Sequence, residues 1–133
     1  AFPTETEADF QMTLDLVKEI DFEGAYTFIF SKRAGTPAYS FEDVIPEQEK
    51  KDRLQRLIEV VNEGYYRASQ KYKDQVVGVL VEGTSKQDEQ TLAGYSEHNK
   101  LVNFKGDKSL IGKIVKVKIT EPRTWFLNGA ACE

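Results

Sequence analysis

The segment GKIVKVKITEP, residues 112–122, decides how the second half of the chain folds. Its apolar and charged side chains alternate with the two-residue period of a β-strand that has one face in a core and the other in water. We expect Ile114, Val117 and Ile119 to point mostly inward, and Lys113, Lys116 and Lys118 to point mostly outward. Val115 breaks the alternation, which indicates a β-bulge.

Four further runs of this kind lie around the segment and are separated by turns rich in Gly, Asn, Asp and Ser. They are QVVGVLVEG (75–83), TLAGYSEH (91–98), LVNFKG (101–106) and TWFLNGA (124–130). Five short strands at close spacing are typical of a small closed sheet. The predicted fold of residues 74–133 is therefore all-β, a small five-stranded barrel.

The first part of the chain has the pattern of an α/β repeat. Thr4 and Glu7 have the spacing of a capping box, and apolar residues at helical spacing predict a helix over about 5–19. The run AYTFIF (25–30) is continuous and apolar, which is typical of a strand buried on both faces.

A second helix is predicted from Pro46, whose missing N–H costs nothing at the first helical position, to about residue 71. Helix, buried strand and helix together predict an α/β domain over residues 1–73. We place the domain boundary between residues 73 and 74, where the period of the apolar pattern changes from helix to strand.

The composition excludes several classes of protein. Of the 133 residues 40% are hydrophobic and 30% are charged, and no apolar run is as long as a membrane span. The start, AFPTETEADF, is acidic and is no signal peptide, so we expect a cytoplasmic protein with no membrane partner. The single cysteine, Cys132, rules out an internal disulfide and a cysteine-only metal cluster within this chain.

Charge is distributed unevenly along the chain. Residues 1–23 hold seven acids against one lysine, whereas residues 99–123 hold seven cations against two acids, although the net charge of the chain is −4. A polyanion would therefore meet the C-terminal part first. Small barrels with such a surface commonly bind nucleic acid, although outward lysines also serve simply to keep sheet edges soluble.

The candidate RNA contacts follow from this pattern. They are Lys86, Asn99, Lys100, Asn103, Phe104, Lys105, Lys108, Lys113, Lys116, Lys118 and Arg123. Trp125 fits the barrel core or rim better than a base-stacking platform. His98, the only histidine, fits a turn or surface residue better than a catalytic base.

The loop SKRAGTPAY, residues 31–39, leaves the predicted strand and carries Lys32 and Arg33 beside a Gly-Thr-Pro turn. Ligands of α/β folds bind outside the carboxyl ends of the strands, so a guanidinium here suits a phosphate. The alternative is that the two cations only solvate the loop. Glu7 is explained by helix capping, and Glu5 is left open between an acid–base role and a structural one.

Five motifs carry a resemblance to a known family. They are FPTETEADF, YTFIFSKRAGTPA, IPEQEKKDRLQRL, VLVEGTSK and HNKLVNFKG with LIGKIVKVKIT after it. In this order they resemble the MiaB family of tRNA methylthiotransferases, radical SAM enzymes that methylthiolate C2 of isopentenylated adenosine next to the anticodon. The resemblance covers essentially all 133 residues.

The resemblance implies a fold and site residues. Residues 1–73 would be the C-terminal part of a radical SAM α/β barrel with a bridging helix. Residues 74–133 would be a TRAM domain, a five-stranded antiparallel barrel similar to the OB fold, that binds tRNA. The family's GFPGET motif lies near S-adenosylmethionine, which implies cofactor contact for Phe2, Pro3 and Glu5, although Thr4 replaces the usual Gly. The family's loop at the active-site mouth matches Ser31, Arg33, Gly35, Thr36 and Pro37.

The resemblance also implies an incomplete enzyme. The parent would use two 4Fe-4S clusters and S-adenosylmethionine, with a sulfur source and an electron donor, but the cysteines for both clusters are missing here. We therefore expect a monomeric fragment, inactive alone, with no catalytic residue and no metal, that binds the anticodon stem-loop of tRNA and positions it.

Two alternatives stay open. One is a sister methylthiotransferase that acts on another modified adenosine or on a ribosomal protein. The other is a free-standing, non-enzymatic TRAM-type RNA-binding protein. Arg33 argues against the protein-modifying branch, whose loop usually carries acids, and the first 73 residues argue against a free-standing binder.

Overall fold

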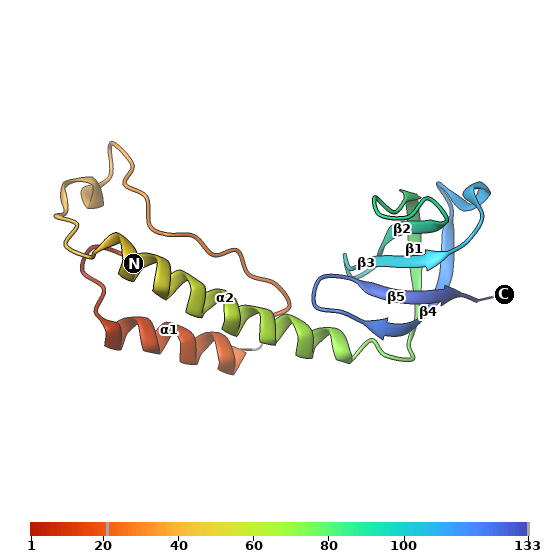
Figure 1. The fold of residues 1–133 in the computed structure, drawn as a ribbon, viewed down its shortest axis with the longest axis horizontal. Coiled ribbons are helices and arrows are strands. Elements are labelled where there is room, and N and C mark those ends of the chain that lie inside the picture. Colours follow the sequence, from red (N-terminus) through yellow and green to blue (C-terminus); the bar gives the residue numbers. More distant parts are fainter. Residues whose placement is uncertain (21, 133) are drawn as a thin grey trace. The chain divides into compact units, whose positions relative to one another are not determined.

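The computed structural model describes residues 1–20 and 22–132, and the chain divides into two compact units, Ala1–Gly64 and Tyr65–Glu133 (Figure 1). The division falls within helix α2 (Glu47–Gln70). The boundary predicted between residues 73 and 74 lies in the turn that follows this helix, and it stays a prediction.

In the first unit, helix α1 (Glu7–Ile20) begins two residues later than predicted. The preceding residues form a turn in which the Glu5 N–H donates to the Phe2 carbonyl at 2.8 Å. The capping box predicted for Thr4 and Glu7 is therefore wrong. The cap is formed by Thr6 and Asp9, because the N–H of each donates to the side chain of the other, at 2.9 and 3.2 Å.

The strand predicted over residues 25–30 is also wrong. The segment is extended but belongs to no sheet, and its side chains alternate: residues 25, 27 and 29 are half-buried, whereas Tyr26 and Phe28 are 93% and 80% exposed. A strand buried on both faces needs neighbouring strands and a covering layer on each side. Residues 1–20 and 22–64 supply two helical segments and the 3₁₀ turn η1 (Pro37–Ser40), so the predicted part of an α/β barrel is not formed.

Helix α2 confirms the second predicted helix. The Lys50 N–H donates to the carbonyl of Pro46 at 3.1 Å, which closes the first turn. In the first unit, the buried side chains of helix α2 include two cations, Lys50 and Arg53, as well as the apolar Val61. No helix in the part of the chain that the structure describes is long and apolar enough to cross a membrane.

The second unit is the predicted five-stranded barrel (Figure 1). Its strands are β1 (Val76–Thr84), β2 (Thr91–Ser96), β3 (Leu101–Lys105), β4 (Ile114–Pro122) and β5 (Leu127–Ala131). The sheet closes in the order β1-β2-β3-β5-β4, with a 3₁₀ turn η2 (Lys108–Leu110) before β4. The expectation of a wholly antiparallel sheet is wrong at one seam, since β3 and β5 run parallel.

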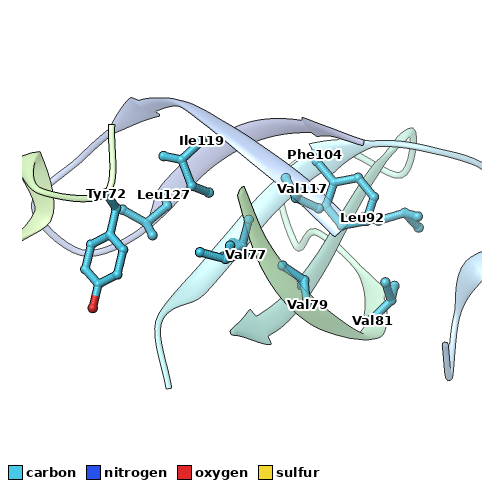
Figure 2. Close-up of a cluster of buried hydrophobic side chains, with 10 residues drawn as sticks. Tyr72, Val77, Val79, Val81, Leu92, Phe104, Val117, Ile119 and Leu127 are labelled. Atoms are coloured by element: carbon cyan, nitrogen blue, oxygen red, sulfur yellow. The ribbon is translucent and has the colours of Figure 1, made fainter. Parts of the chain in front are cut away.

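The barrel core consists of alternate strand residues that point inward (Figure 2). Eight of them are less than 2% exposed. These are Val79, Val81, Leu92, Val102, Phe104, Val117, Ile119 and Leu127. The core is therefore built entirely from apolar residues of the five strands, with Tyr72 from the turn after α2 at one end.

In β4, the inward and outward side chains alternate differently from the prediction. Val115, Val117 and Ile119 point inward, and Ile114 is 76% exposed. The predicted bulge at Val115 is wrong, because the register of β4 with β1 is regular there. The irregularity lies instead between Ile119 and Glu121, opposite β5.

Two glycines allow the small barrel to close. A Cβ on Gly94 of β2 would lie 2.1 Å from the Leu80 carbonyl oxygen, and one on Gly129 of β5 would lie 2.5 Å from the Lys118 carbonyl oxygen. Real Cβ atoms do not approach backbone so closely, so both positions require Gly.

Candidate functional site

A row of outward side chains crosses three strands of the barrel. In register, Lys105 on β3 pairs with Ala130 on β5, and Ala130 pairs with Lys118 on β4. Both lysines are exposed, and only the small Ala130 lies between them. Lys116 lies two residues before Lys118 and is exposed on the same face of β4. The row therefore gathers three of the expected cations on neighbouring strands.

The remaining lysines of the barrel lie apart from this row. Lys113 is exposed just before β4, and Lys86 is exposed in the connection between β1 and β2. Lys108 is exposed in η2, where its Nζ lies 4.0 Å from a carboxylate oxygen of Glu89. An exposed pair at this distance contributes little to stability, so Lys108 stays available to another anion.

A pocket of about 670 Å³ lies beside the lysine row. Its floor is the outward face of β2, β3 and β5, through Ala93, Tyr95, Leu101, Asn103 and Asn128. One wall is the end of β1 and the start of its connection to β2, residues 82–88, and Phe126 from the connection between β4 and β5 forms part of another. In register the floor row Ala93–Asn103–Asn128 is the next outward row after Thr91–Lys105–Ala130.

The two asparagines of the floor differ in their surroundings. Asn128 Nδ2 donates to Glu121 Oε2 at 3.1 Å, and Glu121 in turn lies 2.7 Å from Arg123. The side chain of Asn103 has no hydrogen-bond partner within residues 1–20 and 22–132. One amide is therefore held in a fixed orientation, and the other is free to bind a ligand.

The structure separates four expected RNA contacts from this surface or changes their role. Phe104 is 2% exposed in the barrel core, so its assignment as an RNA contact is wrong. Side chains alternate along a strand, so Phe104 points inward and its neighbour Asn103 points outward. Asn99 has a left-handed φ of 57° in the turn between β2 and β3, and Lys100 is half-buried there with its N–H bonded to Ser96. Arg123 is engaged by Glu121.

Sequence reasoning missed three residues of the pocket region: Asn128, Glu121 and Phe126. We searched for positive charge, and none of the three is a cation. The signal was present in TWFLNGA, since Leu127 is an inward residue and Asn128 and Phe126 on either side of it lie on the outward face.

In the first unit, the loop over residues 31–37 is held by its own backbone. Lys32 Nζ donates to the Phe41 carbonyl, and Thr36 Oγ1 donates to the Arg33 carbonyl at 2.8 Å. Gly35 has a φ of 85°, which favours Gly. Ser31, Arg33 and Pro37 are exposed. Lys32 is therefore occupied within the loop, whereas the Arg33 side chain extends into solvent.

Phe2, Pro3 and Glu5 lie near this loop. The Phe2 ring contacts the rings of Phe30 and Phe41 edge-on, at centroid distances of 5.0 and 5.8 Å. Pro3 and Glu5 line a surface pocket together with Phe41. Glu5 Oε1 accepts from Arg53 at 2.9 Å, which gives Glu5 a structural role.

Ion pairs hold α1 and the first part of α2 together. Both oxygens of Glu7 accept from Arg56, at 2.6 and 3.0 Å, and these hydrogen bonds hold the pKa of Glu7 below its usual value. Hydrogen bonding to Lys50 at 2.6 Å likewise lowers the pKa of Asp43. The predicted capping role of Glu7 is thus replaced by a bridge between two helices.

The chain does not fit a metal cluster. Within residues 1–20 and 22–132 no group of three or more His, Cys, Asp or Glu side chains could hold a metal ion. An iron–sulfur cluster requires several cysteine thiolates, and this chain has one cysteine. No chemical step on such a cluster can therefore be derived from these residues.

Comparison with known proteins gives a consistent result. The TRAM domain family matches residues 70–132. A tRNA-2-methylthio-N(6)-dimethylallyladenosine synthase of Oceanobacillus iheyensis is 57% identical over 132 residues, which is 99% of this chain and 25% of the relative. Proteins of the same name from Bacillus cytotoxicus and Clostridium tetani are 54% and 52% identical, over 99% and 96% of this chain and 26% and 28% of the relatives.

The chain thus spans about a quarter of the length of the curated relatives it matches. Its barrel with the order β1-β2-β3-β5-β4 coincides with the residues that match the TRAM domain. The chain belongs to the TRAM-containing region of the tRNA-2-methylthio-N(6)-dimethylallyladenosine synthase family.

Proposed function

We propose that this chain is the tRNA-binding part of a tRNA methylthiotransferase that acts on isopentenylated adenosine. The observation that carries the proposal is the match of 52–57% identity over nearly the whole chain to synthases of that name. The relatives are about four times as long, so the chemistry belongs to the whole protein. The family resemblance implies that S-adenosylmethionine and iron–sulfur clusters supply that chemistry.

The barrel would bind the anticodon stem-loop of tRNA. Barrels of the OB type bind oligonucleotides over the face of strands 2 and 3 and the neighbouring loops, which is where the pocket lies. Lys105, Lys116 and Lys118 would neutralise phosphates beside it. Because positioning of a substrate can lower a reaction barrier by several kcal/mol, a domain that only holds RNA can still govern the rate.

The first unit would contribute residues that contact the RNA substrate and the cofactor. Arg33 is exposed on a loop that is closed by hydrogen bonds from Lys32 and Thr36, and a free guanidinium suits a phosphate of the RNA. Phe2, Pro3 and Glu5 line or border a surface pocket, which is compatible with the cofactor contact that the resemblance implies. These roles rest on the resemblance and on exposure.

The dependence of binding on salt tests the proposal. The chain should bind an anticodon stem-loop, and the affinity should fall steeply with salt as counterions are released. The triple change Lys105→Ala, Lys116→Ala and Lys118→Ala should reduce the slope of log K against log[salt] by up to about 2, measured by fluorescence anisotropy. Lys51→Ala, an exposed lysine on α2, is the control and should leave the slope within error. A chain that does not bind the stem-loop would refute the proposal.

A further inference from the structure

We propose that the pocket over β2, β3 and β5 binds one unpaired RNA base and prefers adenine to uracil. The inference rests on the proposed RNA binding by the barrel and adds which base the surface selects. The geometry that carries it is the free amide of Asn103 with the acceptors of Asn128 and of two carboxylates in the same pocket. The lining also includes Lys86, a donor.

Asn103 supplies the free amide. It lies on the outward face between the buried Val102 and Phe104, so its side chain is directed into the pocket. No described residue satisfies its donor or its acceptor. An amide that offers one donor beside one acceptor matches adenine, which presents an amino group beside a ring nitrogen.

Asn128 presents an acceptor to the same pocket. One N–H of its Nδ2 donates to Glu121 Oε2, so its Oδ1 and its second N–H are left for a ligand. Arg123 lies 2.7 Å from the other oxygen of Glu121 and fixes that carboxylate. Glu121 is therefore a positioning residue, because it acts on the base only through the orientation of Asn128.

Two carboxylates add acceptors to the wall. Glu82 and Asp88 both line the pocket, and Asp88 is held by hydrogen bonds from Thr91 Oγ1 at 2.7 Å and the Gln90 N–H at 2.9 Å. The exocyclic amino group of adenine can donate to such acceptors. Uracil has a carbonyl oxygen at the corresponding position, which cannot donate to these two carboxylates and would leave them unpaired.

Apolar side chains and cations complete the pocket. Tyr95, which is 41% exposed, and Phe126 line it and offer surfaces on which a base can stack. Lys105 lies in the adjacent row at the pocket edge. A base in the pocket would thus have its phosphate within reach of the lysine row.

The test compares two short single-stranded RNAs, one of uridines only and one with a single central adenosine, on the full chain. Fluorescence anisotropy should show at least about fivefold tighter binding of the RNA with adenosine. Asn103→Ala should bring the ratio of the two affinities close to one and leave the salt slope unchanged, because no charge is removed. Gln75→Ala, an exposed amide outside the pocket, should leave both unchanged.

Glu121→Gln gives an independent readout. A glutamine at position 121 can either accept or donate, so it no longer fixes which way the Asn128 amide points. The preference for adenosine should therefore fall while the thermal midpoint followed by Trp125 fluorescence stays the same. Equal affinity for the two RNAs, with a salt slope that still depends on the lysines, would overturn the base preference and leave RNA binding intact. Tighter binding of the uridine RNA would also overturn it, and a chain that binds neither RNA would overturn both proposals.

Discussion

The two units of this chain differ in how their backbone groups are hydrogen-bonded and in how their apolar side chains are buried. The barrel closes its sheet on itself, and each seam is paired within residues 76–131. The first unit leaves an extended segment with Tyr26 and Phe28 almost fully exposed, and its two helical segments are joined by ion pairs of Glu7 and Glu5 with arginines of α2. The comparison teaches that strands can be predicted from sequence where the strands they pair with lie in the same chain.

The largest expected effect comes from deleting one aromatic ring in each unit. Phe104→Ala should destabilise the barrel by about 3–5 kcal/mol, because it leaves a cavity in a closed core. Phe28→Ala should change stability by less than about 0.5 kcal/mol, since its side chain is 80% exposed. Urea unfolding followed by the fluorescence of Trp125, the only tryptophan, measures the barrel, and helical circular dichroism follows the helices.

Equal and small losses for the two changes would mean that the barrel core is not the closed structure described here. A large loss for Phe28→Ala would mean that the extended segment is buried in solution.

A second effect concerns how closely the barrel strands approach. Gly94→Ala should cost about 1–3 kcal/mol, because the new Cβ would collide with the Leu80 carbonyl and force the β1–β2 seam apart. Gly83→Ala is the matched control on β1, where a Cβ would meet nothing within 4 Å. Trp125 fluorescence in urea compares the two, and similar midpoints would show that the seam at Gly94 is looser than the structure indicates.

The smallest expected effect is a difference between the two units in how their stability depends on pH. The pKa of Glu7 is lowered in the folded state by hydrogen bonds from Arg56, so the stability that it contributes is present above its unfolded pKa and is lost as pH falls through its folded pKa. Asp43 behaves in the same way through Lys50. In the barrel, the lowered pKa values of Asp88 and Asp107 come mainly from hydrogen bonds to residues at most three positions away, which join no two strands.

Helical circular dichroism should therefore weaken as the pH falls below the ordinary carboxyl range of Glu7 and Asp43, at a temperature where Trp125 fluorescence is unchanged. Glu7→Gln should make the helical signal less dependent on pH, and Glu59→Gln on an exposed part of α2 serves as the control. A loss of both signals together at one pH would contradict the difference between the units.

Much of the barrel was predictable from the sequence, and the reason is physical. Period-two alternation with turn residues between the runs specified all five strands, because each inward residue meets a core made by the same chain. The parallel seam between β3 and β5 was not predictable, since alternation carries no information on strand direction. The error at Ile114 arose because Val115 and Ile114 are both aliphatic, and only the pairing with β1 decides which one points inward.

The site was predictable in part. Lysines at outward positions of β3 and β4 were identified from charge, but a barrel wraps its strands, so only the register shows that Lys105 and Lys118 flank Ala130. Neutral side chains such as Asn128 gave no charge signal. In the first unit, Thr4 and Thr6 both suit a cap, and the turn at residues 2–5 decides between them.

The most direct test of the central claim, that RNA binds over the face of β2, β3 and β5 beside the lysine row, is a map of backbone amide chemical shifts while an anticodon stem-loop is added to the full chain. We predict that the largest changes fall on residues 85–95, 101–105 and 127–130, and that they disappear at high salt. Changes confined to residues 1–20 and 22–64, with the barrel amides unmoved, would contradict it.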